Sequence, residues 1–203
     1  MKEARPVVDT PFSAVLLAGG KSTRMGFDKA TCIIEGLPLW ERQLQTLQSL
    51  GAAEIFISGS ATGPWQGNGV TVIEDEIPFA GPMGALLGIL QKISTERVLV
   101  LAVDMPRMTS EFLIELLKTS GAVVPRNGAY FEPLAAIYAQ SGLDLLKTFL
   151  QTERRSLQEY LRASVDSGTI KIYEIRPTEL RLFANFNEPV MLKSATFEIS
   201  NSS

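Results

Sequence analysis

The chain has 203 residues, of which 45% are hydrophobic and 20% are charged, and its formal net charge at neutral pH is −3. This length is typical of one domain with a sizeable core, and the acidic balance excludes a global attraction to nucleic acid or to an anionic membrane. There is no histidine and one cysteine, Cys32, which excludes histidine-based catalysis, an intramolecular disulfide and a cysteine-based zinc site. Metal chemistry must therefore use carboxylate or amide oxygens, which suit magnesium or manganese.

No apolar run approaches the roughly 18 residues typical of a membrane helix. The N-terminal residues also lack the apolar segment of a signal peptide. We therefore expect a cytoplasmic protein with neither a membrane nor a nucleic acid as its partner.

Short apolar segments alternate with segments of helical periodicity along most of the chain. In chain order we predict a strand at 13–17, a helix at 38–50, strands at 54–58 and 70–73, a helix at 81–92, a strand at 97–103, a helix at 109–119, strands at 122–125 and 134–138, a helix at 140–151, a short helix from 156 and a strand at 170–175. The helix boundaries carry recognisable signals: Pro38 suits a first turn, Gly51 suits a C-terminal cap, and Thr109 or Ser110 suits an N-cap. Residues 156–159 (SLQE) read as a capping box.

The alternation predicts an α/β fold: a single three-layer α/β/α domain with a mainly parallel, Rossmann-like sheet. We expect it to span residues 13–195, between an N-terminal tail at 1–12 and a C-terminal tail at 196–203. The strand at 97–103 (RVLVLAV) is apolar nearly throughout, as is typical of a strand covered on both faces. Ligands of such sheets bind at the carboxyl ends of the strands.

A loop rich in glycine and basic residues follows the first strand, within LLAGGKSTRMGFDKA at residues 16–30. It is not a Walker A loop, because position 15 is Val15 where the first glycine would be needed, and no spacing of its glycines matches the dinucleotide fingerprint. Glycine backbone and the side chains of Arg24 and Lys29 nevertheless suit phosphate. From spacing alone, a glycine turn with solvated basic side chains stays open.

The residues of this loop, LAGG at 17–20, Ser22, RMG at 24–26 and DKA at 28–30, closely resemble the opening signature of the molybdenum cofactor guanylyltransferase family. That family belongs to the nucleotide-diphospho-sugar transferase superfamily. Later segments are similar to the family in the same order: GPMGAL at 81–86, LAVDMP at 101–106, EPLAAIY at 132–138 and FANFNEP at 183–189. The combination is more specific than any one piece.

The resemblance implies transfer of GMP from GTP to the phosphate of molybdenum-loaded molybdopterin, with release of pyrophosphate. It implies Mg²⁺, with Mn²⁺ as an alternative, and transient contact with other molybdenum cofactor proteins. Such chemistry requires positioning and charge neutralisation and needs no protein nucleophile, which fits a chain without histidine.

The resemblance also implies roles for individual residues. Lys29, Arg24 and Asp104 are the expected catalytic residues, with Asp104 holding the metal. The expected nucleotide-binding residues are Leu17, Ala18, Gly19, Gly20, Gly26, Lys29, Asp75, Gly81 and Asp104. The acceptor side is expected to use Asn185, Asn187 and Glu132.

Several of these residues also admit a simpler interpretation. Asp104 could cap a turn, Asp75 could be a surface turn residue, and Asn187 could cap a helix that starts near Pro189. Arg154 and Arg155 read either as a solvated pair or as a phosphate contact on the pterin side.

The chain departs from the family pattern at Ser58, where some relatives have asparagine, at Ala85, where many have glycine, at Glu132, where some have histidine, and at Glu188. Ser58 bears on base selection, so a cytidylyltransferase is the nearest alternative. Such relatives usually carry Pro-Lys where this chain has Asp28-Lys29, which favours guanine. More distant alternatives are a sugar-1-phosphate nucleotidylyltransferase and a nucleotide-binding regulatory module without catalysis.

Overall fold

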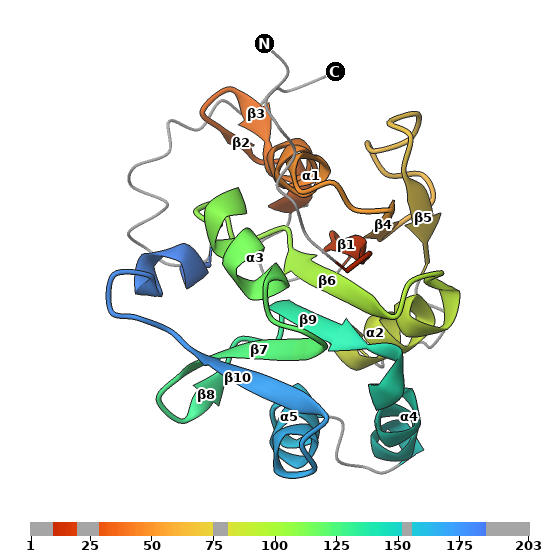
Figure 1. Cartoon of the computed structure of the whole chain (residues 1–203). Helices are drawn as coiled ribbons and strands as arrows, with labels where there is room; N and C mark the ends of the chain where they lie inside the picture. Colours follow the sequence, from red (N-terminus) through yellow and green to blue (C-terminus); the bar gives the residue numbers. More distant parts are fainter. Residues whose placement is uncertain (1–9, 20–28, 75–80, 152–155, 186–203) are drawn as a thin grey trace.

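The computed structural model describes residues 10–19, 29–74, 81–151 and 156–185. They form a central sheet with helices on both faces (Figure 1). The three-layer α/β fold predicted from the sequence is therefore confirmed.

The sheet has eight strands, and its main path runs in the order β10-β7-β9-β6-β1-β4-β5, with β8 paired to β7. The strands are β1 (Ser13–Leu17), β4 (Glu54–Ser58), β5 (Thr71–Ile73), β6 (Arg97–Ala102), β7 (Ala122–Asn127), β8 (Tyr130–Phe131), β9 (Ala135–Ala139) and β10 (Ile170–Glu174). Strands β5, β4, β1 and β6 are mutually parallel, and β1 lies in register between β4 and β6. Since β9 is antiparallel to both β6 and β7, and β10 is parallel to β7, the carboxyl ends of β6, β7 and β10 lie at one edge.

Alternate residues of the strands face two separate cores. One core lies under α1 (Leu39–Ser49) and α3 (Ser110–Leu117), where Ala14 and Leu16 of β1 are buried. The other lies under α2 (Gly81–Lys92), α4 (Leu143–Gln151) and α5 (Leu157–Asp166), where Val15 is buried. This period of two is what a strand produces when both of its faces are covered.

The predicted elements are all present, with shifts at their ends. Thr109 is the N-cap of α3 and accepts a hydrogen bond from the Phe112 amide, as predicted. The helix predicted over 140–151 begins with a 3-10 turn, η2 (Gln140–Gly142). The strand predicted at 122–125 extends to Asn127 and turns back into β8.

Two predicted helix starts are wrong in detail. Pro38 is not in the first turn of α1 but precedes it in extended conformation, because the hairpin of β2 (Ile33–Ile34) and β3 (Leu37–Pro38) runs up to the helix. The capping box at 156–159 does not form: Ser156 is the N-cap of α5 but its side chain accepts no capping bond. The side chain of Gln158 instead bonds the backbone N–H and C=O of Phe131.

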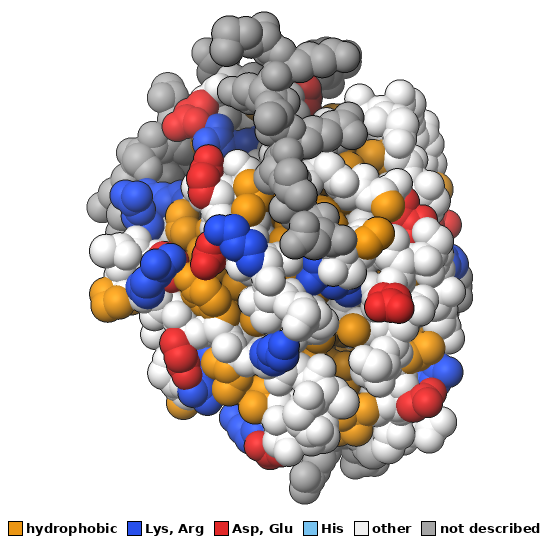
Figure 2. Space-filling model, in the orientation of Figure 1, with side chains coloured by type: hydrophobic (Ala, Val, Ile, Leu, Met, Phe, Trp, Pro, Cys, Tyr) orange, Lys and Arg blue, Asp and Glu red, His pale blue; other side chains and the backbone are white. Residues whose placement is uncertain are grey.

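The remaining elements are two short 3-10 turns, η1 (Lys29–Thr31) and η3 (Leu180–Phe183). In the described part of the chain, every helix is too short or too polar to span a lipid bilayer. Figure 2 shows acidic and basic side chains interspersed over the visible face rather than gathered on one element.

Candidate active site

The end of β1 is held between its two neighbours by backbone hydrogen bonds. The carbonyl of Leu17 accepts from the Val103 amide at 3.0 Å, just beyond β6. On the other side, the amides of Ala18 and Gly19 both donate to the carbonyl of Ser58, at 2.9 and 2.7 Å. The first residues of the glycine loop are therefore fixed at the carboxyl end of the sheet, where ligands of such folds bind.

Gly19 lies where there is little space for a side chain. A Cβ atom there would lie 3.3 Å from both the Cα of Gly59 and the carbonyl oxygen of Ser58. Both neighbours are backbone atoms of the adjacent strand end, which cannot rotate away as a flexible side chain can. The close approach of the two segments therefore favours a residue without a side chain.

Lys29 and Asp104 meet at this edge of the sheet. Lys29 begins η1, directly after the glycine loop, and Asp104 follows the end of β6. Their Nζ and Oδ2 atoms are 3.9 Å apart, and their side chains are only 19% and 23% exposed. The structure thus brings together the two residues that the sequence placed on separate segments of the predicted site.

Burial raises the pKa of Asp104 above its ordinary value, against the opposing effects of the Lys29 charge and of the backbone amide of Asp104 itself. A carboxylate taken out of water is stabilised by positive charge. Lys29 supplies part of that charge at a distance longer than a direct hydrogen bond. The arrangement leaves Asp104 able to interact with a further cation.

Helix α1 supports the turn that carries Asp104, a role that the sequence reading missed. The buried side chain of Gln43 donates to the carbonyl of Met105, and Arg42 Nε donates to the carbonyl of Pro106 at 3.3 Å. Arg42 is also paired with Glu35 at 2.6 Å. The available signal was a glutamine on the apolar stripe of α1, because a polar residue in a core position usually bonds a specific partner.

Three other predicted residues lie in the described part of the chain. Gly81 is the exposed first residue of α2 and has a φ of +57°, a conformation that glycine adopts readily. Glu132 precedes β9, in a segment joined to β6 by the Ala102 amide donating to the Leu134 carbonyl at 2.8 Å. Burial raises the pKa of its carboxyl group. Asn185 is exposed and follows η3.

Within the described part of the chain, no hydrogen bond or ion pair joins these three residues to Lys29 or Asp104. Gly20, Arg24, Gly26, Asp75 and Asn187 lie outside the described residues, as do Arg154, Arg155 and Glu188. Their expected roles therefore stay predictions.

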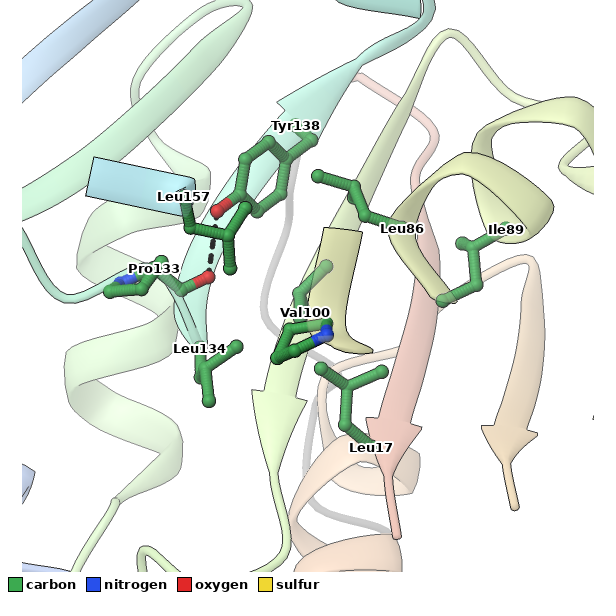
Figure 3. Close-up of a pocket in the computed structure, with 9 residues that line it drawn as sticks. Leu17, Leu86, Ile89, Val100, Pro133, Leu134, Tyr138 and Leu157 are labelled. Carbon is green, nitrogen blue, oxygen red and sulfur yellow. Dashed lines mark hydrogen bonds between the residues drawn. The ribbon is translucent and has the colours of Figure 1, made fainter. Parts of the chain in front are cut away.

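A small apolar hollow lies beside the end of β1, on the face covered by α2 and α5. It has about 200 Å³ of empty space, a volume that includes open solvent. Figure 3 shows Leu86 and Ile89 of α2 facing Leu17 and Val100 of the sheet, while the Tyr138 hydroxyl donates to the Pro133 carbonyl at 2.7 Å. The residues that line it are uncharged, so we assign it no part in phosphate chemistry.

Comparison with known proteins shows the family to which the chain belongs. The family model described as the MobA-like NTP transferase domain matches residues 14–167. The chain belongs to this family. Its enzyme class is accordingly nucleotidyltransferase, and the matched residues include Lys29, Asp104 and all of β1 but its first residue.

Two curated relatives resemble this chain over nearly their whole length. A protein of Opitutus terrae named probable molybdenum cofactor guanylyltransferase is 33% identical over 184 residues, which cover 87% of this chain and 91% of that protein. A protein of Methanothermobacter thermautotrophicus with the same name is 29% identical over 195 residues, covering 89% and 97% of the two chains.

A solved structure shares the fold. The crystal structure titled molybdopterin-guanine dinucleotide biosynthesis protein A, from Archaeoglobus fulgidus, superposes with a TM-score of 0.70 at 24% identity, covering 90% of this chain and 95% of that one. At this identity the likeness supports the fold alone.

Proposed function

We propose that this family member transfers GMP from GTP to the phosphate of molybdenum-loaded molybdopterin, giving a guanine dinucleotide cofactor and pyrophosphate. The observation that carries the proposal is the Lys29–Asp104 pair at 3.9 Å, next to the glycine loop at the end of β1. The names of the curated relatives support the choice of substrates.

In the proposed reaction, a phosphate oxygen of the acceptor attacks the α-phosphorus of GTP. One P–O bond forms as the bond from the α-phosphorus to the bridging oxygen of pyrophosphate breaks. Negative charge spreads over the oxygens of the transferring group, and a fixed cation stabilises that charge. Lys29 serves this purpose, because its ammonium is held at the edge of the sheet, partly shielded from water.

The residues present fit a magnesium ion. Asp104 offers carboxylate oxygens in a half-buried position whose charge is only partly balanced by Lys29. In the described part of the chain there is no group of three or more candidate metal ligands. Magnesium bound to nucleotides typically uses one or two protein carboxylates, the phosphates and water. When bound there, the ion would neutralise phosphate charge, and Mn²⁺ offers similar chemistry.

For the acceptor, we propose that Asn185, Asn187 and Glu132 contact the pterin or its phosphate. Glu132 precedes the start of β9, which lies beside the end of β6 that leads to Asp104, and Asn185 follows η3. Amide and carboxyl groups suit the polar ring of a pterin, which presents both donors and acceptors. We further propose a cytoplasmic location and transient contact with other molybdenum cofactor proteins.

The test is a pyrophosphate-release assay with the purified chain, Mg²⁺ and molybdate-loaded molybdopterin, with GTP and CTP offered separately. We expect release with GTP only. Pyrophosphate release with CTP only would support the same mechanism with cytosine as the base. Ser58 would then be the first residue to test for base selection. Tight nucleotide binding without any release would favour a non-catalytic nucleotide-binding module.

A further inference from the structure

The segment that follows β10 is fixed by a group of polar contacts that the proposed mechanism does not use. It covers residues 175–185 and ends at Asn185. Because β10 is parallel to β7, the segment begins at the same edge of the sheet as Asp104. Figure 1 shows it running from β10 to the blue turn η3 beside α3.

Glu179 is the centre of these contacts. Its carboxylate accepts from the Tyr173 hydroxyl at 2.9 Å, from the Arg176 amide at 2.9 Å and from Arg176 Nε at 2.8 Å, and it also pairs with Arg176 Nη2. The residue is only 8% exposed. We call Tyr173, Arg176 and Glu179 the Glu179 clamp.

The clamp ties one end of the segment to β10, because Tyr173 is a strand residue. The backbone continues the restraint: the Glu179 amide donates to the Arg176 carbonyl at 2.9 Å and the Leu182 amide to the Glu179 carbonyl at 2.8 Å. Side-chain and backbone bonds therefore restrain the turn that leads into η3.

The other end of the segment is fixed by aromatic packing. The ring of Phe112 packs edge to face against Phe183, with centroids 5.2 Å apart, and against Tyr173, with centroids 5.5 Å apart. Phe112 is in the first turn of α3, the helix that follows the Asp104 turn. Asn185 comes two residues after Phe183, so its backbone is anchored to the element next to Asp104.

We propose that the Glu179 clamp positions Asn185 for contact with the acceptor, and that Glu179 acts through this segment without touching substrate. This inference rests on the proposed function for the nature of the acceptor. A carboxylate with several donors holds a fixed geometry more firmly than neutral hydrogen bonds do, and fixed geometry is what in-line transfer requires. Acceptor affinity should therefore depend on the clamp more than GTP affinity does.

The variants are Glu179→Gln, which places an amide NH₂ against donors, and the milder Tyr173→Phe, which removes one hydroxyl and keeps the ring packing. Glu174→Gln is the matched control, because Glu174 lies next to Tyr173 on β10 but forms an exposed ion pair with Arg126. Asn185→Ala serves as the reference for a lost acceptor contact. For each variant we would measure kcat, KM for GTP, KM for molybdopterin and amide hydrogen exchange over residues 176–185.

We expect Glu179→Gln to raise KM for molybdopterin about tenfold and to speed exchange in the segment, with KM for GTP near wild type. Tyr173→Phe should show a smaller rise of KM for molybdopterin and a smaller increase in exchange. Glu174→Gln should show neither change. Asn185→Ala should raise the acceptor KM with unchanged exchange over 176–183.

Two results would overturn the proposal. The first is faster amide exchange in Glu179→Gln with an unchanged KM for molybdopterin. The second is an equal rise of KM for GTP and KM for molybdopterin that parallels the loss of thermal stability. Failure of the proposed function is distinguishable, since the wild type itself would then show no turnover. In that case unchanged exchange in Glu179→Gln, or unchanged affinity for molybdopterin measured by equilibrium binding, would still overturn the role of the clamp.

Discussion

The ammonium of Lys29 lies 3.9 Å from the carboxylate of Asp104, although the two residues are far apart in the sequence. They meet because β1 and β6 are parallel neighbours, so the segments that leave their carboxyl ends lie side by side. This pair is the centre of the proposed site.

Replacing Lys29 with alanine should lower kcat by about 10²–10³-fold, the usual cost of removing one group that stabilises transition-state charge. GTP affinity should fall much less, because other groups of the site also contact the phosphates in the proposed mechanism. Single-turnover pyrophosphate release and equilibrium GTP binding separate the two effects. Lys118→Ala is the control, since Lys118 forms an exposed ion pair with Glu115. Equal losses of binding and turnover would contradict the catalytic role of Lys29.

Replacing Asp104 with asparagine should abolish the dependence of turnover on Mg²⁺ and lower activity by roughly 10²-fold or more, since an amide is a weaker ligand than a carboxylate. With a non-hydrolysable GTP analogue present, Mg²⁺ should raise the melting temperature of the wild type and not that of the variant. Asp144→Asn, at an almost fully exposed side chain, should keep the full Mg²⁺ response. An unchanged response in Asp104→Asn would rule out the proposed metal ligand.

The same variant makes a prediction about stability without metal or nucleotide. Burial raises the pKa of Asp104 in the folded protein. The contribution of Asp104 to folding stability is therefore greatest below the ordinary carboxyl pKa and is lost as the pH rises through the raised pKa. Asp104→Asn should therefore melt no lower than the wild type at pH 7, and any advantage should disappear towards pH 3. Thermal melts across this range check the sign, and a lower melting temperature at pH 7 would contradict it.

Gly19→Ala should weaken GTP binding while leaving the fold in place. The added Cβ would lie 3.3 Å from backbone atoms of Ser58 and Gly59, so we expect a small shift of the backbone at Gly19 away from β4. We expect KM for GTP to rise about tenfold, equivalent to about 1.4 kcal/mol, with a small change in melting temperature. Gly88→Ala, where the nearest atom is the Ile73 methyl at 4.0 Å, is the control. Wild-type KM in Gly19→Ala would show that the close approach does not matter for the nucleotide.

Arg97→Met should destabilise the protein by about 2–3 kcal/mol in urea unfolding, the range for leaving buried partners of a charged donor unpaired. The Arg97 guanidinium is nearly buried and donates to the carbonyls of Thr119, Leu117 and Thr10 at 2.7, 3.1 and 3.2 Å. It therefore ties the C-terminal end of α3 to β6. Arg162→Met, at an exposed position on α5, should change stability by less than about 0.5 kcal/mol.

Arg97 lies at the opposite end of β6 from Asp104. The folded fraction of Arg97→Met should for that reason keep its activity, measured at a temperature well below the melting point. A loss of kcat without a loss of stability would contradict the structural role assigned to Arg97.

Glu54 should make the protein sensitive to acid. Burial opposes its charge, but hydrogen bonds from the Ser13 hydroxyl at 2.6 Å and the Ser94 amide at 2.7 Å outweigh it and lower the pKa of Glu54. Because the pKa of Glu54 is lowered in the folded protein, its charged carboxylate stabilises the fold at pH values above the ordinary pKa of about 4.5. This contribution to stability is lost as the pH falls through the pKa of the folded state. Glu54→Gln should therefore narrow the drop in melting temperature between pH 5 and pH 3. Glu96→Gln, at an exposed position, is the control. Its melting temperature should fall more between pH 5 and pH 3 than that of Glu54→Gln.

Much of the fold was predictable from local patterns. The apolar runs of β1 and β6 and the Gly-Pro start of α2 have strong local signals, and the structure confirms these elements. Two predicted helix starts failed for separate reasons. Pro38 pairs with Ile33 in a short hairpin before α1 begins, and Ser156 caps α5 without a side-chain hydrogen bond. The bonds between Gln158 and the backbone of Phe131 join different elements, and no local pattern indicates them.

By itself, the sequence determined which chemistry is available and which segments carry it. The absence of histidine, the glycine loop before Lys29 and the aspartate after a buried strand are properties of the chain, as are the short-range propensities that form the strands and helices. These features were enough to indicate a phosphate site at the carboxyl ends of a sheet.

Only the tertiary structure decided which of these residues meet. The direction of β9, the distance from Lys29 to Asp104 and the support of the Asp104 turn by Gln43 depend on contacts between segments distant in the sequence. Local propensity carries no information about such contacts, because strand order and the packing of helices on the sheet are set by burial of the whole core.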